Sequence, residues 1–258
     1  MIDLQPERVM VVGDWHGNPA WADEVLKYGH RHGVDTVVHV GDYGFWVPSA
    51  RTHAFLTAVD QRCDLYDMNF FWSRGNHEYQ PGLEECNQPG EPEPVQFKGF
   101  DRTWFLPDGF RWNWWGLTWM SLGGAHSVDR TWRTEGVDWW PTETLTDAQV
   151  EYASRPGGVD VIIAHDAPYG VDIPGIGPPV PGGDFPFEDL VAADEHRRKI
   201  RKVVDAVGPS LYFHGHYHRY YTGKLGDMSV FGLDRDGSQV LKNTILLTYE
   251  GAEGLAEG

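Results

Sequence analysis

The sequence predicts an α/β fold in which two sheets pack face to face and helices cover their outer sides. Three observations support this: five short apolar runs each end at a polar motif, four helical patterns lie between them, and two stretches alternate aromatic or apolar residues with polar ones. Apolar, β-branched runs of this length are typical of buried strands. The length of 258 residues fits one large domain that spans residues 1–258.

The elements can be placed in chain order. Strands are expected at residues 8–12, 36–40, 69–73, 159–164 and 211–213, and helices at residues 21–32, 49–66, 146–154 and 187–206. Residues 97–122 alternate aromatic and polar side chains, which indicates antiparallel strands. Near the end of the chain, residues 229–233 and 239–247 flank Asp236-Gly237. Because this dipeptide is a turn signal, we expect a hairpin there.

Five short motifs follow the expected strands. In order they are Asp14-x-His16, Gly41-Asp42, Gly75-Asn76-His77-Glu78, His165 and Gly215-His216-Tyr217-His218. Ligands of open α/β sheets bind outside the carboxyl ends of the strands, so residues remote in sequence can converge there. Carboxylate, amide and imidazole donors without a thiolate suit divalent ions such as Mn, Fe(II), Zn, Co or Ni. The motifs together predict a two-metal phosphoesterase site.

Each motif alone has a simpler interpretation. Asp14-x-His16 could be a turn before a helix cap, and Gly41-Asp42 an ordinary strand-to-loop turn. A single histidine such as His165 is more often a buried, hydrogen-bonded side chain than a ligand. His216 and His218 could be half of a zinc site, or strand residues that point to the same side. The occurrence of all the motifs at strand ends favours the metal site.

With these motifs in this order, residues 9–218 resemble the calcineurin-like metallophosphoesterase superfamily, whose pattern is D-x-H, GD, GNH(D/E), H and GHxH. The resemblance implies a four-layer αββα sandwich and two divalent ions, with Mn expected first and Fe, Zn, Ni or Co as alternatives. It implies that one ion is held by Asp14, His16 and His218, and the other by Asn76, His165 and His216. Asp42 would bridge both ions, and His77 would contact the scissile phosphate from outside the metal shell.

Asp42 and His77 are thus the catalytic candidates. Two ions roughly 3.5–4 Å apart can activate a water molecule and stabilise an in-line displacement at phosphorus. Only two of the seven donors carry a formal charge, so the loaded site stays positive and attracts a phosphate oxygen. His77 could then donate a hydrogen bond or a proton to the leaving group.

One departure from the pattern bears on the substrate. In the protein phosphatase branch the second motif is GD-x-x-DRG, whereas here Phe45 and Trp46 occupy the places of its second aspartate and its arginine. His77 therefore lacks the carboxylate partner of that branch, which argues against a phosphoprotein phosphatase. The complete 215–218 motif resembles the phosphodiesterase branch, which includes bacterial cyclic-nucleotide phosphodiesterases.

We therefore expect a small phosphodiester substrate, such as a cyclic nucleotide. A diester carries one negative charge fewer than a monoester dianion and needs less cationic clamping. Two alternatives remain: a phosphomonoesterase or nuclease with the same centre, and a non-catalytic binding module of the same fold. Retention of every donor in the motifs argues against the binding module.

Further residues are candidates for substrate binding. Residues 123–130, followed by Arg133 and Trp139-Trp140-Pro141, resemble a stretch of small bacterial and phage-type members of the superfamily. Within it Arg130 and Arg133 could clamp a phosphate or stack on a base. Alternatively they pair with Asp129 and Glu135 on the surface. His126 is a further candidate from the same stretch.

Other candidates lie outside that stretch. Arg74 could meet the phosphate or support the loop of Asn76. We expect His39 to be packed inside a strand and His214 to support the ligands without binding metal. Four histidines in helical patterns are expected to be solvated: His30, His32, His53 and His196.

Four tryptophans flank motifs: Trp15, Trp46, Trp139 and Trp140. They could stack on a nucleobase, although aromatic residues mostly serve packing. The Pro/Gly-rich segments 80–94 and 168–186 start directly after donor motifs. Long irregular segments rooted at a site are often lids or specificity loops, with plain connections as the alternative.

The charge balance limits the class of partner. The net charge is −17 and the pI is about 5.0, which disfavours stable binding of duplex nucleic acid or of an anionic membrane. A metal cleft can still accept a small anion such as a nucleotide. Residues 1–7 lack the features of a signal peptide and no apolar run reaches transmembrane length, so we expect a cytoplasmic location. The two cysteines, Cys63 and Cys86, agree with a reducing compartment. The sequence does not predict the oligomeric state.

Overall fold

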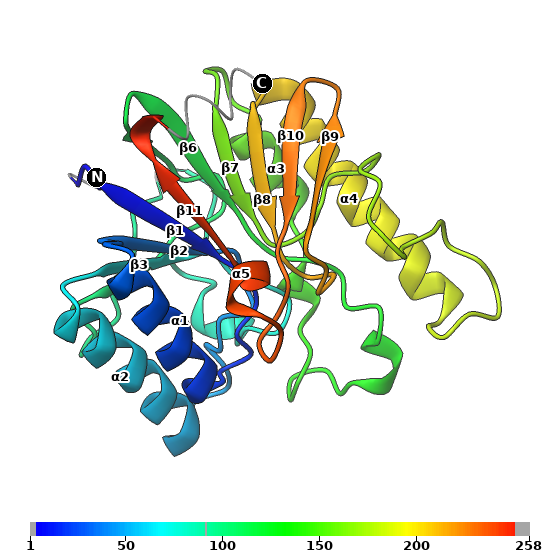
Figure 1. The fold of residues 1–258 in the computed structure, drawn as a ribbon. Coiled ribbons are helices and arrows are strands. Elements are labelled where there is room, and N and C mark those ends of the chain that lie inside the picture. The colour runs from blue at the N-terminus through cyan, green and yellow to red at the C-terminus, as the bar shows by residue number, and fades with distance from the viewer. Residues whose placement is uncertain (1–3, 91, 251–258) are drawn as a thin grey trace.

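Two β-sheets lie face to face, with helices on their outer sides, in the computed structural model, which describes residues 4–90 and 92–250 (Figure 1). The first sheet has the strand order β11-β1-β2-β3-β4, and the second has the order β5-β6-β7-β8-β10-β9. Helices α1 and α2 cover the first sheet, and α3 and α4 cover the second (Figure 1). The expected four-layer arrangement is confirmed.

The first sheet is built from β1 (Arg8–Val12), β2 (Thr36–His39), β3 (Asn69–Trp72), β4 (Thr103–Phe105) and β11 (Thr244–Thr248). Strands β1 to β4 run parallel, while β11 is antiparallel to β1. The connecting helices are α1 (Pro19–Arg31), α2 (Ala50–Leu65) and the short α5 (Val240–Asn243). Asn18 and Ser49 cap α1 and α2, each accepting a backbone N–H from three residues further on.

The second sheet is built from β5 (Arg111–Trp114), β6 (Leu117–Leu122), β7 (Val161–Ala164), β8 (Leu211–His214), β9 (Tyr221–Leu225) and β10 (Met228–Gly232). Strands β6, β7, β8 and β10 are parallel, and β5 and β9 form antiparallel edges. Its helices are α3 (Asp147–Ala153) and α4 (Phe187–Val207). Three short 3-10 helices, η1 (Gln80–Gly82), η2 (Arg130–Trp132) and η3 (Pro141–Glu143), lie in the loops.

Three apolar cores separate the four layers. Alternate residues of one strand point to opposite faces of its sheet, so on β1 Val9 and Val11 enter the core between the sheets, whereas Met10 and Val12 face the core beneath α1 and α2. The second sheet and helices α3 and α4 enclose the third core. Burial on both faces explains why these strands are continuous apolar runs in the sequence.

The expected hairpin at the end of the chain is wrong. Strand β10 pairs with β8 and β9 in the second sheet, while β11 pairs with β1 in the first. The segment between them crosses from one sheet to the other, and its Asp236 N–H donates to the Asp14 carbonyl. The hairpin of this region is instead formed by β9 and β10, and the expectation did not include β9.

The antiparallel strands expected within residues 97–122 are confirmed in part. Strands β5 and β6 form an antiparallel pair, but β4 joins the other sheet, parallel to β3. Two predictions fall partly outside the described residues. Residue 91 belongs to the expected loop 80–94, and residues 1–3 belong to the N-terminal segment that lacks signal-peptide features. Within the described part, both cysteines are free of disulfides, and none of the helices combines the length and apolarity needed to cross a membrane.

Candidate metal centre

The five donor motifs converge at one edge of the molecule. Asp14, Asp42 and Asn76 follow β1, β2 and β3 of the first sheet, while His165 and His216 follow β7 and β8 of the second. These strands are parallel within each sheet. Their carboxyl ends meet, because Asn76 after β3 lies 3.0 Å from His165 after β7, as expected for a ligand site of an α/β fold.

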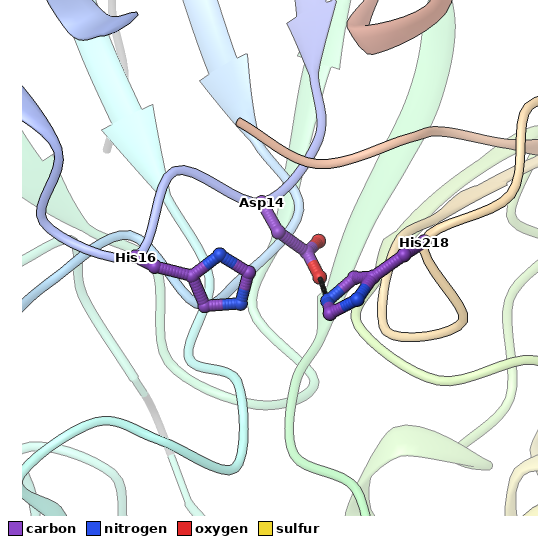
Figure 2. Close-up of side chains that lie close together, drawn as sticks. All are labelled: Asp14, His16 and His218. Atoms are coloured by element: carbon purple, nitrogen blue, oxygen red, sulfur yellow. Dashed lines mark ion pairs between the residues drawn. The ribbon is translucent and has the colours of Figure 1, made fainter. Parts of the chain in front are cut away.

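The first donor group consists of Asp14, His16 and His218, whose ligand atoms lie within 4.8 Å of one another. Figure 2 shows the Asp14 carboxylate between the two imidazole rings. Its Oδ2 atom is 3.2 Å from His218 Nε2. The rings of His16 and His218 meet edge to face, with their centroids 5.0 Å apart.

The second donor group surrounds His165. Its Nε2 atom lies 3.0 Å from Asn76 Oδ1 and 3.5 Å from Asp42 Oδ2. The ring of His216 packs against that of His165, with the centroids 5.1 Å apart. Asp14, Asp42 and His165 also have ligand atoms within 4.8 Å of one another, so the two groups are contiguous.

Asp42 lies between the two groups. Its Oδ2 atom is 3.5 Å from His165 Nε2, 3.6 Å from His16 Nε2 and 3.8 Å from His77 Nε2. Its other carboxylate oxygen, Oδ1, accepts the backbone N–H of His77 at 3.0 Å. One oxygen of Asp42 is thus held by the backbone, while the other faces donors of both groups.

The donor set fits a divalent cation. His16 Nδ1 is 2.8 Å from Asp236 Oδ1, and His165 Nδ1 is 3.2 Å from the Val40 carbonyl oxygen. These acceptors favour a proton on Nδ1 and leave each Nε2 directed at the cluster. A histidine that binds a metal usually donates its other ring N–H to a carboxylate or a carbonyl in this way.

Asn76 is oriented by a chain of two hydrogen bonds. Its Nδ2 atom donates to Ser127 Oγ at 2.9 Å, and Ser127 Oγ donates to Glu143 Oε2 at 2.6 Å. The amide nitrogen is thereby engaged on one side, and the amide oxygen faces His165. Burial raises the pKa of Glu143 to about 7.

The backbone around the donors is tightly constrained. Four of the donor residues have φ between 46° and 66°, in the left-handed region that non-glycine residues rarely adopt. They are His16, Asp42, His216 and His218. A side chain on Gly215 would overlap the Asp14 carboxylate, and one on Gly75 would overlap that of Asp42. Unusual backbone held at a cluster of polar side chains is typical of functional sites.

Glu78 ties the loops of the first sheet together. Its carboxylate is fully buried and accepts the backbone N–H groups of Asp42, Gly44 and Gly75. Burial and the nearby charge of Asp42 raise its pKa to about 7. Its contacts support the loops after β2 and β3 and so the positions of Asp42 and Asn76.

The electrostatics of the cluster favour positive charge at its centre. Burial alone would raise the pKa of Asp42, but the charges of His165 and His77 outweigh it and hold that pKa well below the usual value. Burial opposes a charge on His16, yet contacts with Asp236 and Asp42 raise its pKa to about 11. Burial lowers the pKa of His216 to about 4, which keeps its imidazole neutral and able to act as a ligand.

Of the substrate-binding candidates, Arg133 lies beside the cluster. Its Nη2 atom is 3.4 Å from His77 Nε2, and its guanidinium also pairs with Asp129 through contacts of 2.7 and 2.8 Å. The expected surface partner Asp129 is therefore present, but the pair stands next to His77.

The other three candidates make their contacts elsewhere. Arg74 is 1% exposed and pairs with Asp108 at 2.8 Å, which matches the alternative interpretation of loop support. His126 and Arg130 both contact the buried carboxylate of Asp189, at 3.2 and 3.0 Å. Arg130 also lies over the ring of Trp139.

Of the remaining histidines, His39 is packed as expected, and His30, His32 and His53 are exposed as expected. His39 packs against Trp15 in the core beneath α1 and α2. His214 Nε2 lies 2.7 Å from the Tyr221 hydroxyl oxygen. The expectation that His196 is solvated is wrong, because it is buried and its Nδ1 lies 2.9 Å from Asp166 Oδ2. A helical pattern alone does not reveal a partner on another element.

Three supporting residues were missed in the sequence: Asp236, Ser127 and Glu143. Asp236 lies in an Asp-Gly pair that predicts a hairpin turn, so the sequence indicates no further role for its carboxylate. Ser127 follows the candidate His126 directly, and that proximity was the available signal. Glu143 lies in a short 3-10 helix, and no periodic pattern marks it.

Comparisons with known proteins show the family of this chain and support its fold. The family model described as calcineurin-like phosphoesterase matches residues 7–220. The crystal structure of TT1561 of Thermus thermophilus superposes with a TM-score of 0.57 at 10% identity, over 95% of this chain and 100% of that one. A second crystal structure gives 0.55 at 12% identity, over 95% and 100%. At such identities these likenesses show the fold alone. A search of curated proteins finds no match.

Proposed function

The chain belongs to the calcineurin-like phosphoesterase family, and from that premise we propose that it hydrolyses small phosphodiesters, such as cyclic nucleotides, with two divalent ions. Manganese is the first choice of ion, with Fe, Zn, Ni or Co as alternatives. The family match and the Asp/His groups positioned for metal support a metal-dependent phosphoesterase.

One observation carries the proposal of two ions: Asp42 Oδ2 lies 3.6 Å from His16 Nε2 and 3.5 Å from His165 Nε2, and so faces both donor groups. Asp14, His16 and His218 would hold one ion, and Asn76, His165 and His216 would hold the other, with Asp42 shared. When bound, the pair supplies Lewis-acid activation of water and stabilises charge on the phosphoryl group.

We assign the role at the leaving group to His77. Its backbone N–H holds Asp42, while its side chain, 27% exposed, is the outermost of the three imidazoles around Asp42 Oδ2. From there the imidazole can donate a hydrogen bond to the oxygen that leaves. Arg133, 3.4 Å from His77 Nε2, can attract a phosphate oxygen to the same place.

The charges around His77 support a diester rather than a monoester dianion. Arg133 is already paired with Asp129, and Arg74 forms a buried ion pair with Asp108. Neither of these two arginines thus offers unpaired cationic charge at the expected phosphate position, and a singly charged diester needs less of it. The net charge of −17 supports a small-molecule substrate rather than a duplex or a membrane surface.

The test is reconstitution and turnover. Metal is stripped with a chelator and Mn²⁺ is added back, and bound metal per chain is counted. Substrates are 2′,3′- and 3′,5′-cyclic nucleotides, a linear dinucleotide, single-stranded nucleic acid, a phosphomonoester and a phosphopeptide. We expect two ions per chain and a preference for small diesters. Preference for the monoester or for nucleic acid would instead favour the alternative enzymes.

A variant separates catalysis from binding. His77→Ala should keep both ions and lose diester turnover, whereas the control His53→Ala, at an exposed position of α2, should keep both properties. Unchanged turnover in His77→Ala would remove this residue from the mechanism. A metal-loaded protein that turns over none of the substrates would favour a binding module of the same fold.

A further inference from the structure

A pocket of about 460 Å³ opens beside the metal centre. His16 and His77 both line it, so it is continuous with the place expected for the phosphate. We call it the Trp46 pocket, and the lining residues that matter below are Trp46, Trp140, Val47, Val137 and Arg51. Its volume is within the range of small-molecule pockets, roughly 300–1,000 Å³.

Two indole rings give the pocket fixed aromatic surface. Trp46 lies against the turn after His16, because a Cβ on Gly17 would lie 3.2 Å from two of its ring carbons. Trp140 is 8% exposed and packs edge to face on Tyr79, with the centroids 5.5 Å apart. Trp46 is only half-buried and is held in place by its contact with Gly17, so its ring offers a face for a planar ligand at little cost in side-chain entropy.

Apolar side chains next to the indoles remain in water. Val47 is 43% exposed and Val137 is 62% exposed, and both line the same pocket. Covering them removes apolar surface from water, which favours a ligand with an apolar face. A bare phosphate or a sugar phosphate has no such face.

The pocket also contains a cation without a partner. In the described part of the chain Arg51, in the first turn of α2, has no ion pair within 4 Å and no hydrogen bond from its side chain. Arg133, in contrast, is held by Asp129. Arg51 can therefore donate hydrogen bonds to acceptor atoms at the edge of a ring that lies on Trp46.

We propose that the Trp46 pocket is the subsite for the planar aromatic group of the phosphoester, a nucleobase. The base stacks on Trp46 and is met at its edge by Arg51, while the phosphate lies at the donors beside His77. A nucleobase combines a flat face with hydrogen-bond acceptors, and stacking on aromatic residues accepts every base. This inference rests on the proposed phosphoester hydrolysis and names the substrate class of that site.

The test compares two probes, one that carries the base and one that has a hydroxyl group in its place. They are the non-hydrolysable phosphonate analogues of adenosine 5′-monophosphate and of ribose 5-phosphate, titrated calorimetrically into the Mn²⁺-loaded protein. We expect the adenosine compound to bind about tenfold more tightly or better, as a stacked base allows. Trp46→Leu, which keeps an apolar side chain, should remove most of that preference and leave the affinity for the ribose compound unchanged.

Two more variants make the result specific. Arg51→Met lies at an exposed position where folding is not at risk. It should lower the affinity for the adenosine compound severalfold and leave the affinity for the ribose compound unchanged. Trp132→Leu, at a tryptophan that is 64% exposed and outside the pocket, should change neither. Equal affinity for both probes, or an equal loss in Trp132→Leu, would overturn the assignment.

The outcome is separable from that of the proposed function. If the adenosine preference and its loss in Trp46→Leu are found in a protein that hydrolyses none of the test esters, the subsite stands and the enzymatic proposal fails. If the protein hydrolyses diesters but binds both probes equally, the subsite alone is rejected.

Discussion

His16 and Asp236 are joined through His16 Nδ1 and Asp236 Oδ1, which lie 2.8 Å apart although 220 positions separate the residues in the chain. The other carboxylate oxygen of Asp236 accepts a hydrogen bond from Asn18 Nδ2, and the backbone N–H of Asp236 donates to the Asp14 carbonyl. Asp236 thereby sets the ring orientation of His16 and connects the loop after β1 to the segment that crosses between the sheets.

Asp236→Ala should therefore weaken metal binding without removing a ligand. Loss of such a supporting carboxylate typically lowers metal affinity by about 10- to 100-fold. The measurement is the dissociation constant for Mn²⁺ by calorimetry. Asp234→Ala is the matched control, because within the described residues its side chain accepts a hydrogen bond only from the adjacent Arg235 N–H. Equal affinity in the two variants would show that Asp236 does not support the site.

The sequence could predict the donors of this site but not the residues that orient them. Donors such as Asp14 and His165 directly follow strands, and apolar runs identify strands well. The contact of Asp236 with His16 could not be predicted, because a pattern of period two shows which residues form strands but not which strands pair. Asp236-Gly237 therefore predicts a hairpin turn, although the segment around it joins β10 of one sheet to β11 of the other.

The sequence also did not reveal which polar residues of helices and loops are buried against a partner. His196 looks like any polar residue on a helix, and its position became clear only when α4 was placed against Asp166. Ser127 and Glu143 lie in a loop and a 3-10 helix, where no period exists to analyse. Contacts between elements remote in sequence decide these cases, and a single sequence does not report them.

Ser127→Ala should also lower metal affinity, because it removes the acceptor of Asn76 Nδ2 and leaves the amide free to rotate. We expect a loss of about tenfold, as for other supporting hydrogen bonds. Ser121→Ala is the control, since this serine is equally buried but donates to the Leu106 carbonyl, outside the site. The idea fails if Ser127→Ala binds Mn²⁺ as tightly as Ser121→Ala does.

Glu143 should make the free energy of unfolding depend on pH. Burial raises its pKa from 4.5 to about 7, so the folded chain retains this proton over a range where the unfolded chain has lost it. The stabilising contribution is complete below about pH 4.5 and disappears as the pH rises through about 7.

The variant Glu143→Gln has no titrating group at this position. The free energy of unfolding of the unsubstituted protein, minus that of the variant, should fall by about 3 kcal/mol between about pH 5 and pH 8. Urea unfolding in the presence of a chelator measures it. A difference that stays constant across this range would contradict the raised pKa.

Arg74→Met should destabilise the fold strongly. Arg74 and Asp108 are each 1% exposed in their side chains and are joined at 2.8 Å, and Arg74 Nη1 also donates to the Thr142 and Glu143 carbonyls. Removing one partner of a buried pair leaves an uncompensated charge and costs about 3–5 kcal/mol. Thermal and urea unfolding provide the measurement.

The control for this prediction is Arg102→Met. Arg102 pairs with Asp64 and Asp67 on the surface, where both carboxylates are largely exposed, so its loss should cost at most about 1 kcal/mol. Similar costs for the two variants would mean that the Arg74 pair is not the support of the Asn76 loop that its contacts indicate.

Gly215→Ala should abolish metal binding at the first donor group while the fold persists. The Cβ of an alanine would overlap Asp14 Oδ1 and lie 3.0 Å from a Val40 methyl carbon, so the Asp14 carboxylate must turn away from His218. Asp14 also accepts the backbone N–H of His216, which would be displaced with it. Gly158→Ala is the control, because nothing lies within 4 Å of its added Cβ. We expect Gly158→Ala to bind metal with unchanged stoichiometry and Gly215→Ala to lose at least one ion, as counted by elemental analysis after dialysis. Full metal content in Gly215→Ala would show that the close approach of this backbone to Asp14 is not required, since the site would then have accommodated the extra methyl group.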